Sequence, residues 1–285
     1  MTSEADYLRM LESVFHAQSE EIEVGIGDDA AVIAPQKRAL ALSTDMAVEG
    51  THFNRQWSSL YEIGGKVTAA NLADIFAMGG RPKFLLVAAA IPTNFSLNEI
   101  KELAQGIQDE ASKVRAYVVG GDLTRSALLT IAVTVFGDVE NPILRSGAKV
   151  GDYVCVSELP GKSSRGLELL KSGIFDEQTL DHRHPIVNYE KISHLDRLNV
   201  NSLTDVSDGL ISELSGIAEA SKVRIELDSA KFPCNQYVLH GGEDHVFVGT
   251  FTALPDGWFK LGSVVSGTGV YLDGTQISHQ GFEHF

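Results

Sequence analysis

The sequence predicts an α/β (α+β) fold in two domains. Strand-like and helix-like segments alternate through both halves of the chain, which favours this class over an all-helical fold. The chain has 285 residues, more than most single domains, and 44% hydrophobic residues, enough for a substantial core. A turn-rich stretch at residues 145–152 precedes a new strand pattern. We therefore expect domains at residues 1–146 and 147–285.

The first domain is predicted to alternate strands with helices. Residues 61–78 have apolar positions at helical spacing and are followed by Gly79-Gly80 and Pro82, which end helices. Ser96 and Glu99 form a capping-box pattern before a second apolar stripe that reaches Val114. Strands are expected at residues 39–44, ending at Asp45, and at 84–91, 116–119 and 128–136.

The second domain is predicted to repeat this alternation. Helices are expected after Ser163, around residues 187–197, and from Asp208 to about Ala220. Strands are expected at residues 153–157, 223–227, 246–251 and 261–265.

The charge balance disfavours some classes of partner. Lys and Arg total 23 against 38 for Asp and Glu, a formal net charge of −15. No nucleic acid or anionic membrane is therefore expected to bind through a broad basic surface. ATP remains compatible with this charge, because Mg²⁺ can supply the missing positive charge.

The ends and the cysteines indicate a soluble, cytoplasmic protein. The N-terminus is acidic and lacks the pattern of a signal peptide. The longest apolar run, residues 84–91, is far shorter than the roughly 18 residues that cross a bilayer. Cys155 and Cys234 cannot form a disulfide framework and are expected to be reduced structural thiols.

Aspartates recur beside small residues in separate stretches of the chain. Glycine, serine and threonine let a backbone approach a ligand closely, and carboxylates bind hard cations. If the fold gathers these stretches, they would form an oxygen-rich magnesium site suited to a polyphosphate. The aspartates are Asp28 and Asp29 in Gly-Ile-Gly-Asp-Asp, Asp45 in Ser-Thr-Asp, Asp74, Asp122 in Gly-Gly-Asp, and Asp205 and Asp208 in Asp-Val-Ser-Asp-Gly.

Asp74 interrupts the apolar stripe of its predicted helix. It follows Val67 and Ala70 at helical spacing, and an unpaired carboxylate buried there would cost several kcal/mol. We therefore expect a cation, a hydrogen-bond network or a raised pKa at Asp74. Asn71, three residues earlier, could contribute an amide oxygen. The alternative is a structural aspartate paired with a helix terminus.

Asp205 and Asp208 are three residues apart at the start of a predicted helix. At that spacing the two carboxylates can converge on one point. At about 4 Å they would repel by roughly 4 kcal/mol at an effective dielectric of 20, unless a cation intervenes. An N-cap role would explain one of the two aspartates and leave the other unexplained.

Two further features point to phosphate binding. Gly120-Gly121-Asp122 follows a predicted strand, where glycines let a backbone cradle phosphate oxygens; a simple turn is the alternative. Arg145 stands at the predicted domain junction of a very acidic chain and is a candidate phosphate clamp; a surface arginine is the alternative.

Taken together, these stretches resemble the thiamine-monophosphate kinase family, within the superfamily of aminoimidazole ribonucleotide synthetase. The resemblance runs in family order from about residue 20 to 285. Its motifs are Gly-Ile-Gly-Asp-Asp-Ala, Ser-Thr-Asp-Met-Ala-Val-Glu-Gly-Thr-His-Phe, Ala-Asn-Leu-Ala-Asp-Ile-Phe-Ala-Met-Gly, Gly-Gly-Asp-Leu-Thr-Arg, Arg-Ser-Gly-Ala-Lys-Val-Gly-Asp, Asp-Val-Ser-Asp-Gly-Leu-Ile-Ser-Glu-Leu, Gly-Gly-Glu-Asp and the terminal Gly-Phe-Glu-His-Phe. One departure is His245, where the family usually has tyrosine.

The resemblance implies a fold, a reaction and a set of site residues. It implies an N-terminal α/β domain that dimerises through its strands, and transfer of the ATP γ-phosphoryl group to thiamine monophosphate. No general base is assigned, because the acceptor phosphate is already ionised. The implied magnesium ligands are Asp29, Ser43, Thr44, Asp45, Asp74, Asp122, Asp205 and Asp208; the ATP contacts are Gly121, Asp122, Arg145 and Ser207; the thiamine monophosphate contacts are His52, Glu243 and Phe282.

Two other functions stay open at this point. One is another ATP-dependent enzyme of the same superfamily, similar to aminoimidazole ribonucleotide synthetase. The other is a non-catalytic nucleotide-binding paralogue.

Overall fold

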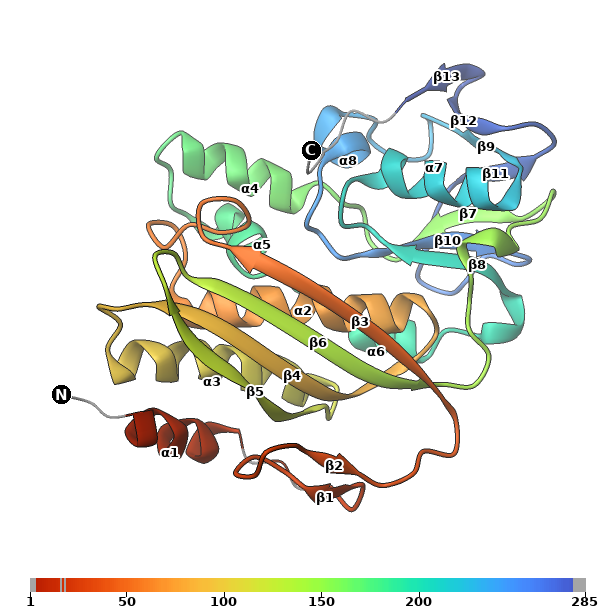
Figure 1. Ribbon diagram of the computed structural model, residues 1–285. Helices are drawn as coiled ribbons and strands as arrows, with labels where there is room; N and C mark the ends of the chain where they lie inside the picture. The colour runs from red at the N-terminus through yellow and green to blue at the C-terminus, as the bar shows by residue number, and fades with distance from the viewer. Residues whose placement is uncertain (1–3, 16, 18, 279–285) are drawn as a thin grey trace. The chain divides into compact units, whose positions relative to one another are not determined.

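The computed structural model describes residues 4–15, 17 and 19–278, and the chain divides into two compact units. Unit 1 comprises Met1–Ile75 and Gly80–Glu140; unit 2 comprises Phe76–Gly79 and Asn141–Phe285. Each unit contains a β-sheet with helices, which confirms the mixed α/β class (Figure 1). The domain boundary predicted between residues 146 and 147 stays a prediction.

Unit 1 is built on a four-stranded sheet of order β3-β6-β4-β5. β4 pairs in parallel with β5 and antiparallel with β6, which pairs antiparallel with β3. The edge strands of this sheet are thus β3 and β5, separated by the two central strands. The bounds are β3 (Ala39–Val48), β6 (Thr130–Val139), β4 (Arg81–Pro92) and β5 (Tyr117–Ser126).

Helices α2 (Leu60–Ala77) and α3 (Leu97–Lys113) lie along the same side of this sheet (Figure 1). The predicted capping box starts α3: Glu99 N donates to Ser96 Oγ at 3.3 Å, and Ser96 N donates to Glu99 Oε2 at 2.7 Å. A short helix, α1 (Glu4–Val14), contacts α3. The chain then forms the small pair β1 (Ile22–Val24) and β2 (Val32–Ile33).

The opposite face of strand β3 carries exposed apolar side chains. Side chains alternate between the two faces of a strand, so Leu40, Leu42, Thr44 and Met46 share one face. Leu42 and Met46 are 60% and 59% exposed. Ser43 and Asp45, in the alternate positions, face the helices. We call the side with Leu42 and Met46 the open face of the unit 1 sheet.

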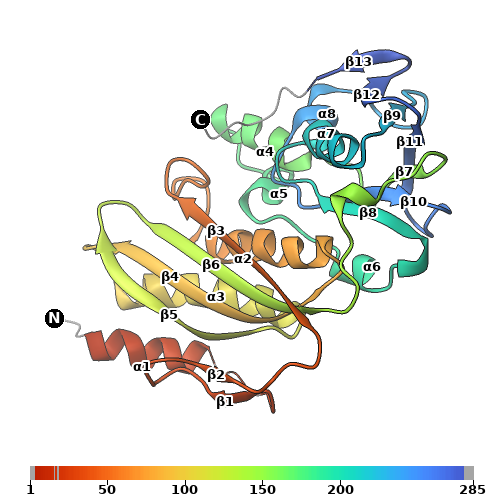
Figure 2. The same cartoon turned by 45° about the vertical axis from the view of Figure 1, so that its right-hand side comes forward.

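Unit 2 contains a seven-stranded sheet of order β13-β12-β9-β11-β7-β10-β8 (Figure 2). All neighbouring strands are antiparallel except β9 and β12, which run parallel. The bounds are β7 (Tyr153–Val156), β8 (Val200–Asp205), β9 (Arg224–Leu227), β10 (Phe247–Phe251), β11 (Phe259–Val265), β12 (Gly269–Leu272) and β13 (Thr275–Ile277).

The core of unit 2 lies between this sheet and helix α7 (Leu210–Ser221). Leu210, Leu214 and Ile217 are fully buried at helical spacing and pack in one cluster with β-strand residues such as Val248. The other helices of unit 2 are short: α4 (Lys162–Lys171), α5 (Leu180–Arg183), α6 (Tyr189–Ser193) and α8 (Gln236–His240), with 3₁₀ turns at Arg145–Gly147, Glu177–Thr179 and Arg197–Asn199.

Some predicted elements differ in extent. Strand β3 continues past Asp45, because β6 pairs with it as far as Val48. The helix expected around residues 187–197 is only Tyr189–Ser193. Asp196 then accepts a hydrogen bond from Leu198 N and starts a separate 3₁₀ turn instead. The pairs β1–β2 and β12–β13 and helices α1 and α8 are missing from the sequence prediction.

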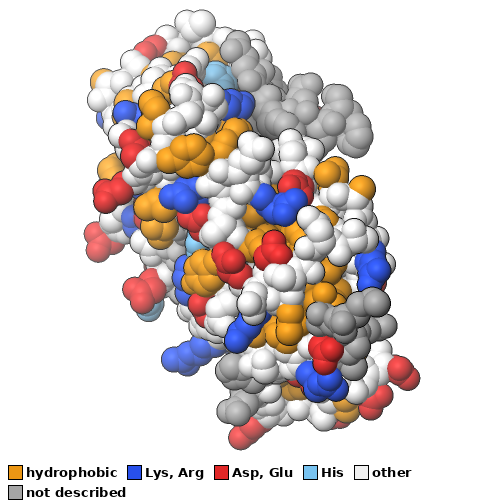
Figure 3. Space-filling model, turned by 90° about the vertical axis from the view of Figure 1, so that its left-hand side faces the viewer, with side chains coloured by type: hydrophobic (Ala, Val, Ile, Leu, Met, Phe, Trp, Pro, Cys, Tyr) orange, Lys and Arg blue, Asp and Glu red, His pale blue; other side chains and the backbone are white. Residues whose placement is uncertain are grey.

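One face of the molecule shows how the charged side chains are distributed. On the face shown in Figure 3, lysine and arginine side chains are scattered among acidic ones, with hydrophobic side chains between them. Within the described ranges, no helix is both long and apolar enough to cross a bilayer.

Candidate active site

Four predicted ligands gather at strand β3. Ser43 Oγ donates a 2.5 Å hydrogen bond to Asp74 Oδ2 on α2, so the polar position in the apolar stripe of α2 has a partner on the sheet. Two residues after Ser43 on β3, the backbone N of Asp45 donates to Asn71 Oδ1 of α2 at 3.1 Å. Thr44 points to the open face, where its Oγ1 lies 2.9 Å from Thr134 Oγ1. We call Ser43, Thr44, Asp45 and Asp74 the β3-edge group.

The chemistry of the β3-edge group fits magnesium. Its side chains offer carboxylate and hydroxyl oxygens, with the Asn71 amide oxygen close by, and hard cations prefer such ligands. Asp74 is partly exposed rather than sealed in the core, so its carboxylate is open to a ligand. Ser43, Asp45 and Asp74 carry these oxygens on the helix side of β3, whereas the Thr44 hydroxyl lies on the open face.

Gly120, Gly121 and Asp122 lie within strand β5, which corrects the prediction that the glycines follow a strand as a phosphate-cradling turn. Gly121 pairs with Val87 of β4, and a Cβ at Gly121 would lie 1.9 Å from Val87 O. Glycine is needed because the strand backbones pass too closely for a side chain. The phosphate-cradle prediction came from a strand expected to end at Val119, seven residues before the observed end at Ser126.

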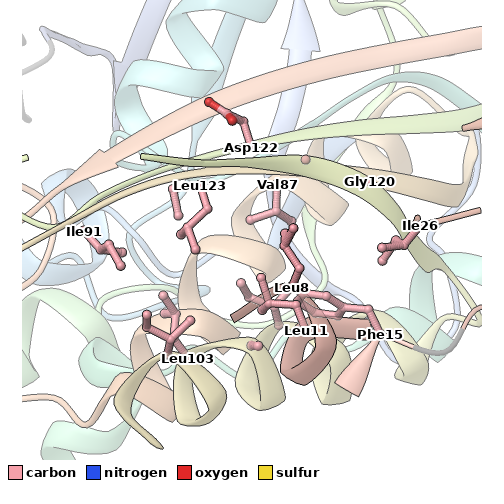
Figure 4. Close-up of a pocket in the computed structure, with 15 residues that line it drawn as sticks. Leu8, Leu11, Phe15, Ile26, Val87, Ile91, Leu103, Gly120, Asp122 and Leu123 are labelled. Carbon is pink, nitrogen blue, oxygen red and sulfur yellow. The ribbon is translucent and has the colours of Figure 1, made fainter. Parts of the chain in front are cut away.

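A cavity of about 120 Å³ lies under this part of β5. Its apolar walls come from α1, α3 and β4, and Gly120, Gly121 and Asp122 also line it. Figure 4 shows Val87 and Leu123 pointing into the cavity and Asp122 pointing away from it, to the other side of the sheet. The Asp122 carboxylate therefore stands on the open face.

The loop with Gly-Ile-Gly-Asp-Asp lies on the β5 side of the sheet. Ile26 lines the same cavity as Gly121 and Asp122, and Asp29 follows Ile26 by three residues. Asp29 is exposed, and its backbone N donates to Asp28 Oδ1 at 2.8 Å.

Unit 1 thus places its predicted ligands at two opposite sheet edges. Asp45 pairs with Val133, Val133 with Val87, and Val87 with Gly121, so Asp45 and Asp122 are separated by the full width of the sheet. Three strand spacings correspond to about 14 Å. Asp45 also faces the helices, whereas Asp122 faces the other way. Within unit 1, the fold does not bring these two carboxylates together.

In unit 2, the two predicted ATP contacts Arg145 and Ser207 meet at a third residue, Glu213. Arg145 Nη2 lies 3.0 Å from Glu213 Oε2, and Ser207 Oγ donates to Glu213 Oε1 at 3.3 Å. Thr204 Oγ1 donates to Glu213 Oε2 at 3.3 Å. Gly216, one turn further along α7, leaves room for the guanidinium: a Cβ there would lie 3.1 Å from Arg145 Nη1.

Glu213 is a buried carboxyl group with an unusual pKa. Its side chain is 4% exposed, whereas that of Arg145 is 52% exposed. Burial raises the pKa of Glu213 to about 7, although the Arg145 guanidinium acts in the opposite direction. Glu213 thus holds the inner side of Arg145 and leaves its outer side open to a ligand.

Asp205 and Asp208 occupy different local positions. Asp205 is the last residue of β8 and is buried, and its Oδ2 lies 3.1 Å from His245 Nδ1. Asp208 lies in the turn before α7, whose N-cap is Gly209 with φ 115°. Neither aspartate is the N-cap, so the capping alternative is wrong, because a left-handed glycine starts the helix.

On the predicted acceptor side, Glu243 and His182 lie close together. His182 Nδ1 is 3.4 Å from Glu243 Oε2 and 3.1 Å from Ser163 Oγ, and Glu243 has a positive φ of 61°. In unit 1, His52 Nδ1 accepts a hydrogen bond from Val48 N at 3.1 Å. Phe282 lies outside the described residues.

The loop that carries Glu243 is fixed by its neighbour Asp244. The Asp244 carboxylate accepts hydrogen bonds from Gly161 N at 2.7 Å and Ser163 N at 3.0 Å, at the start of α4. Burial raises the pKa of Asp244, and these hydrogen bonds act in the opposite direction. Asp244 ties two distant loops of unit 2 together.

Sequence reasoning missed Glu213 and His182. Glu213 lies within the motif Asp-Val-Ser-Asp-Gly-Leu-Ile-Ser-Glu-Leu and interrupts an otherwise apolar helix face, the same signal that identified Asp74. His182 carried no such signal, because it lies in a short segment between two loops. Within the ranges that the structure describes, no three His, Cys, Asp or Glu side chains form a ready-made metal cluster.

Comparisons with known proteins agree on one family. Residues 27–139 match the family model of the AIR synthase related protein, N-terminal domain. A thiamine-monophosphate kinase of Mycobacterium tuberculosis (strain H37Rv) is 35% identical over 291 residues, which cover 94% of this chain and 87% of the relative.

Two solved structures have the same fold. The thiamine-monophosphate kinase from Stenotrophomonas maltophilia K279a superposes with a TM-score of 0.84 at 27% identity, covering 95% of this chain and 96% of that one. AaThiL complexed with AMPPCP and TMP superposes with a TM-score of 0.82 at 28% identity, covering 99% of this chain and 97% of that one. The chain belongs to the thiamine-monophosphate kinase family.

Proposed function

We propose that this protein transfers the γ-phosphoryl group of ATP to thiamine monophosphate in a magnesium-dependent reaction. The bond between the β-γ bridging oxygen and the γ-phosphorus breaks, and a phosphate oxygen of thiamine monophosphate bonds to that phosphorus, giving ADP and thiamine diphosphate. Family membership over nearly the whole chain supports this reaction. The observation that carries it in the structure is the β3-edge group, with Ser43 bonded to Asp74.

The residues of the chain supply position and charge. Phosphoryl transfer depends mainly on alignment and on neutralising the phosphate charge, and magnesium ions bound to carboxylates supply the latter. The β3-edge group, Asp29, Asp122, Asp205 and Asp208 are the proposed ligands. The exposed side of the Arg145 guanidinium would hold a phosphate of ATP, with Ser207 beside it. The ionised acceptor phosphate needs no general base.

The acceptor is assigned to the loop around Glu243 with His52 and Phe282. The thiazolium ring of thiamine monophosphate is cationic, and a carboxylate such as that of Glu243 would attract it. His182, whose Nδ1 also lies 3.1 Å from Ser163 Oγ, is the neighbour of the Glu243 carboxylate, and the Asp244 bonds hold the adjoining backbone.

We also propose that the active protein is a homodimer that packs through the open face of the unit 1 sheet. Leu40, Leu42 and Met46 are 49%, 60% and 59% exposed there, and burying such side chains favours association. Leu42→Glu should shift the protein from dimer to monomer in sedimentation velocity. An unchanged sedimentation coefficient would contradict this interface.

The proposed activity is tested with purified protein, ATP and thiamine monophosphate. Thiamine diphosphate and ADP should form in equal amounts, and chelating magnesium should stop the reaction. Asp74→Asn should lower turnover by at least about a hundredfold, as loss of a charge-stabilising group typically does, with little change in the thermal midpoint. Asp256→Asn, at an exposed turn, is the matched control. Absence of thiamine diphosphate with folded wild-type protein would refute the activity.

A further inference from the structure

We infer that His245 is a positioning residue for magnesium: it holds one oxygen of the Asp205 carboxylate and leaves the other oxygen to bind the metal. This inference rests on the proposed function, because it takes Asp205 to be a magnesium ligand. It adds a residue that has no assigned role, at a position where the family usually has tyrosine.

The contact joins two buried side chains of unit 2. His245 Nδ1 lies 3.1 Å from Asp205 Oδ2, and the two side chains are 8% and 6% exposed. A carboxylate oxygen only accepts, so Nδ1 carries the hydrogen and donates it to Oδ2. Within the described ranges, no hydrogen-bond donor reaches the second oxygen, Oδ1. Among these residues, Asp205 thus has one oxygen held by the protein and one left for a cation.

Backbone hydrogen bonds fix the loop of His245 against the segment that carries Asp205. Phe247 of β10 pairs with Asp205 of β8 at the end of the sheet. Beyond this pair, Val206 N donates to Val246 O at 2.7 Å, and His245 N donates to Val206 O at 3.0 Å. The imidazole and the carboxylate therefore stand on two segments that cannot slide past each other without breaking these bonds.

The backbone conformation of His245 also suits this position. Its φ of 51° is left-handed, a conformation that histidine, asparagine and aspartate adopt more readily than most residues. The preceding residue, Asp244, accepts hydrogen bonds from Gly161 N and Ser163 N. Neighbouring side chains of one loop thus reach two separate segments, the start of α4 and the end of β8.

Holding one carboxylate oxygen orients the other. A carboxylate that is free to rotate can bind a cation through either oxygen or through both, whereas a hydrogen bond to Oδ2 commits Asp205 to Oδ1. The donor also offsets part of the cost of burying the carboxylate. Removing a hydrogen-bond partner of a metal ligand typically weakens metal binding by about 10- to 100-fold.

The place of the donor on the side chain separates histidine from tyrosine. The Nδ1 atom of histidine is bonded directly to Cγ, whereas the single polar atom of tyrosine lies at the far end of its ring. A tyrosine with the same side-chain direction therefore has no donor at the place of Nδ1. Asparagine has one, because its amide nitrogen is also bonded to Cγ.

The inference is tested with two variants of the full chain that separate the donor from the ring. His245→Asn keeps a donor and loses the ring, and His245→Phe keeps a ring and loses the donor. Mn²⁺ binding is followed by electron paramagnetic resonance in the presence of AMPPCP. The Kd for Mn²⁺ should rise about 10- to 100-fold in His245→Phe and stay within about threefold of the wild-type value in His245→Asn. His194→Phe, the same change at an exposed histidine after α6, should leave this Kd unchanged.

The magnesium dependence of turnover gives a second readout. His245→Phe should raise the magnesium concentration that gives half-maximal turnover, with a smaller change in kcat at saturating magnesium. A merely structural role predicts instead a lower thermal midpoint, with the metal affinity of the folded protein unchanged. If circular dichroism shows that His245→Phe does not fold, His245→Leu, which matches asparagine in shape but has no donor, takes its place.

A double-mutant cycle shows whether His245 acts through Asp205. In the Asp205→Asn background, His245→Phe should change the Kd for Mn²⁺ by no more than about twofold, because residues in contact do not contribute independently. Two independent effects would instead multiply.

Three results would overturn the inference: wild-type Mn²⁺ affinity in folded His245→Phe, equal weakening in His245→Phe and His245→Asn, or independent effects in the cycle. Weakened binding in Asp205→Asn beside unaffected binding in His245→Phe refutes the inference alone. If Asp205→Asn itself keeps wild-type Mn²⁺ affinity, the magnesium assignment of Asp205 in the proposed function fails, and the inference fails with it.

Discussion

Arg145 and Glu213 form an ion pair of 3.0 Å in which the carboxylate is buried and the guanidinium is half exposed. Arg145 is one of the ATP contacts that the family resemblance implies, and its orientation depends on a residue of α7 far along the chain. Ser207, the other predicted ATP contact of unit 2, donates to the same carboxylate. Glu213 is thus a positioning residue for the nucleotide side of the site.

Replacing this carboxylate should weaken ATP binding more than it slows the chemical step. Glu213→Gln keeps one acceptor oxygen for Ser207 or Thr204, which donate to different oxygens of Glu213, and removes the charge that holds Arg145. We expect KM for ATP to rise by about tenfold, equivalent to about 1.4 kcal/mol, with a smaller change in kcat. Glu219→Gln, an exposed glutamate on the same helix, is the control. A fall in the kcat of Glu213→Gln with no change in its KM for ATP would argue against a positioning role.

The same carboxyl group predicts a pH dependence of stability. Its folded-state pKa of about 7 lies above the ordinary value of 4.5, so the native state binds more protons than the unfolded state between these values. The free energy of unfolding should therefore fall as pH rises from about 4.5 to about 7. Urea unfolding at several pH values should show a smaller fall in Glu213→Gln, and an identical pH profile in both proteins would contradict the prediction.

The two cysteines should differ in reactivity. Cys155 is fully buried in β7, and burial raises the pKa of its thiol to about 12; Cys234 is partly exposed, and burial raises its pKa less far. The thiolate is the reactive form, so Cys155 should resist DTNB at pH 8 in the folded protein. We expect slow labelling of Cys234 alone, and labelling of both after denaturation. Rapid native labelling of Cys234→Ser would contradict the burial of Cys155.

Gly121 should tolerate no side chain. A Cβ at this position would meet the backbone oxygen of Val87 at 1.9 Å, and neither strand can move without losing ladder hydrogen bonds. Gly121→Ala should destabilise the protein by about 2 kcal/mol or more, in the range of severe steric substitutions. Gly25→Ala, where the nearest atom is a side-chain carbon at 3.7 Å, is the control in thermal unfolding. Equal midpoints would indicate that β5 does not pack against β4 as described.

The capping box of α3 offers a test of local stability. Ser96 Oγ accepts a hydrogen bond from Glu99 N. The Glu99 carboxylate accepts bonds from Ser96 N and Ser96 Oγ, and these two bonds lower the pKa of Glu99. Ser96→Ala should cost about 1 kcal/mol of unfolding free energy. Ser266→Ala, in an exposed turn, should cost far less in the same urea titration. Similar losses in both variants would contradict the cap.

Local patterns were sufficient for most of the elements. The apolar stripe of α2 predicted both the helix and the need of Asp74 for a partner, because helical spacing depends only on nearby residues. The capping box of α3 could be predicted for the same reason, because Ser96 and Glu99 are only three residues apart. The glycines of β5 misled the prediction, because their cause is a neighbouring strand: Gly121 is small to fit Val87, which is far from it in sequence.

The sequence by itself determined the α/β class, the helix that carries Asp74, the acidic character of the site and the motifs of the family. Only the tertiary structure decided the strand order, because strands that pair are distant in sequence and no local pattern predicts which segments pair. That order puts Asp45 and Asp122 on opposite edges of one sheet. Contacts between distant segments also selected Glu213 as the partner of Arg145. The residues proposed for the site could thus be predicted from the sequence, whereas their grouping in space depended on the fold.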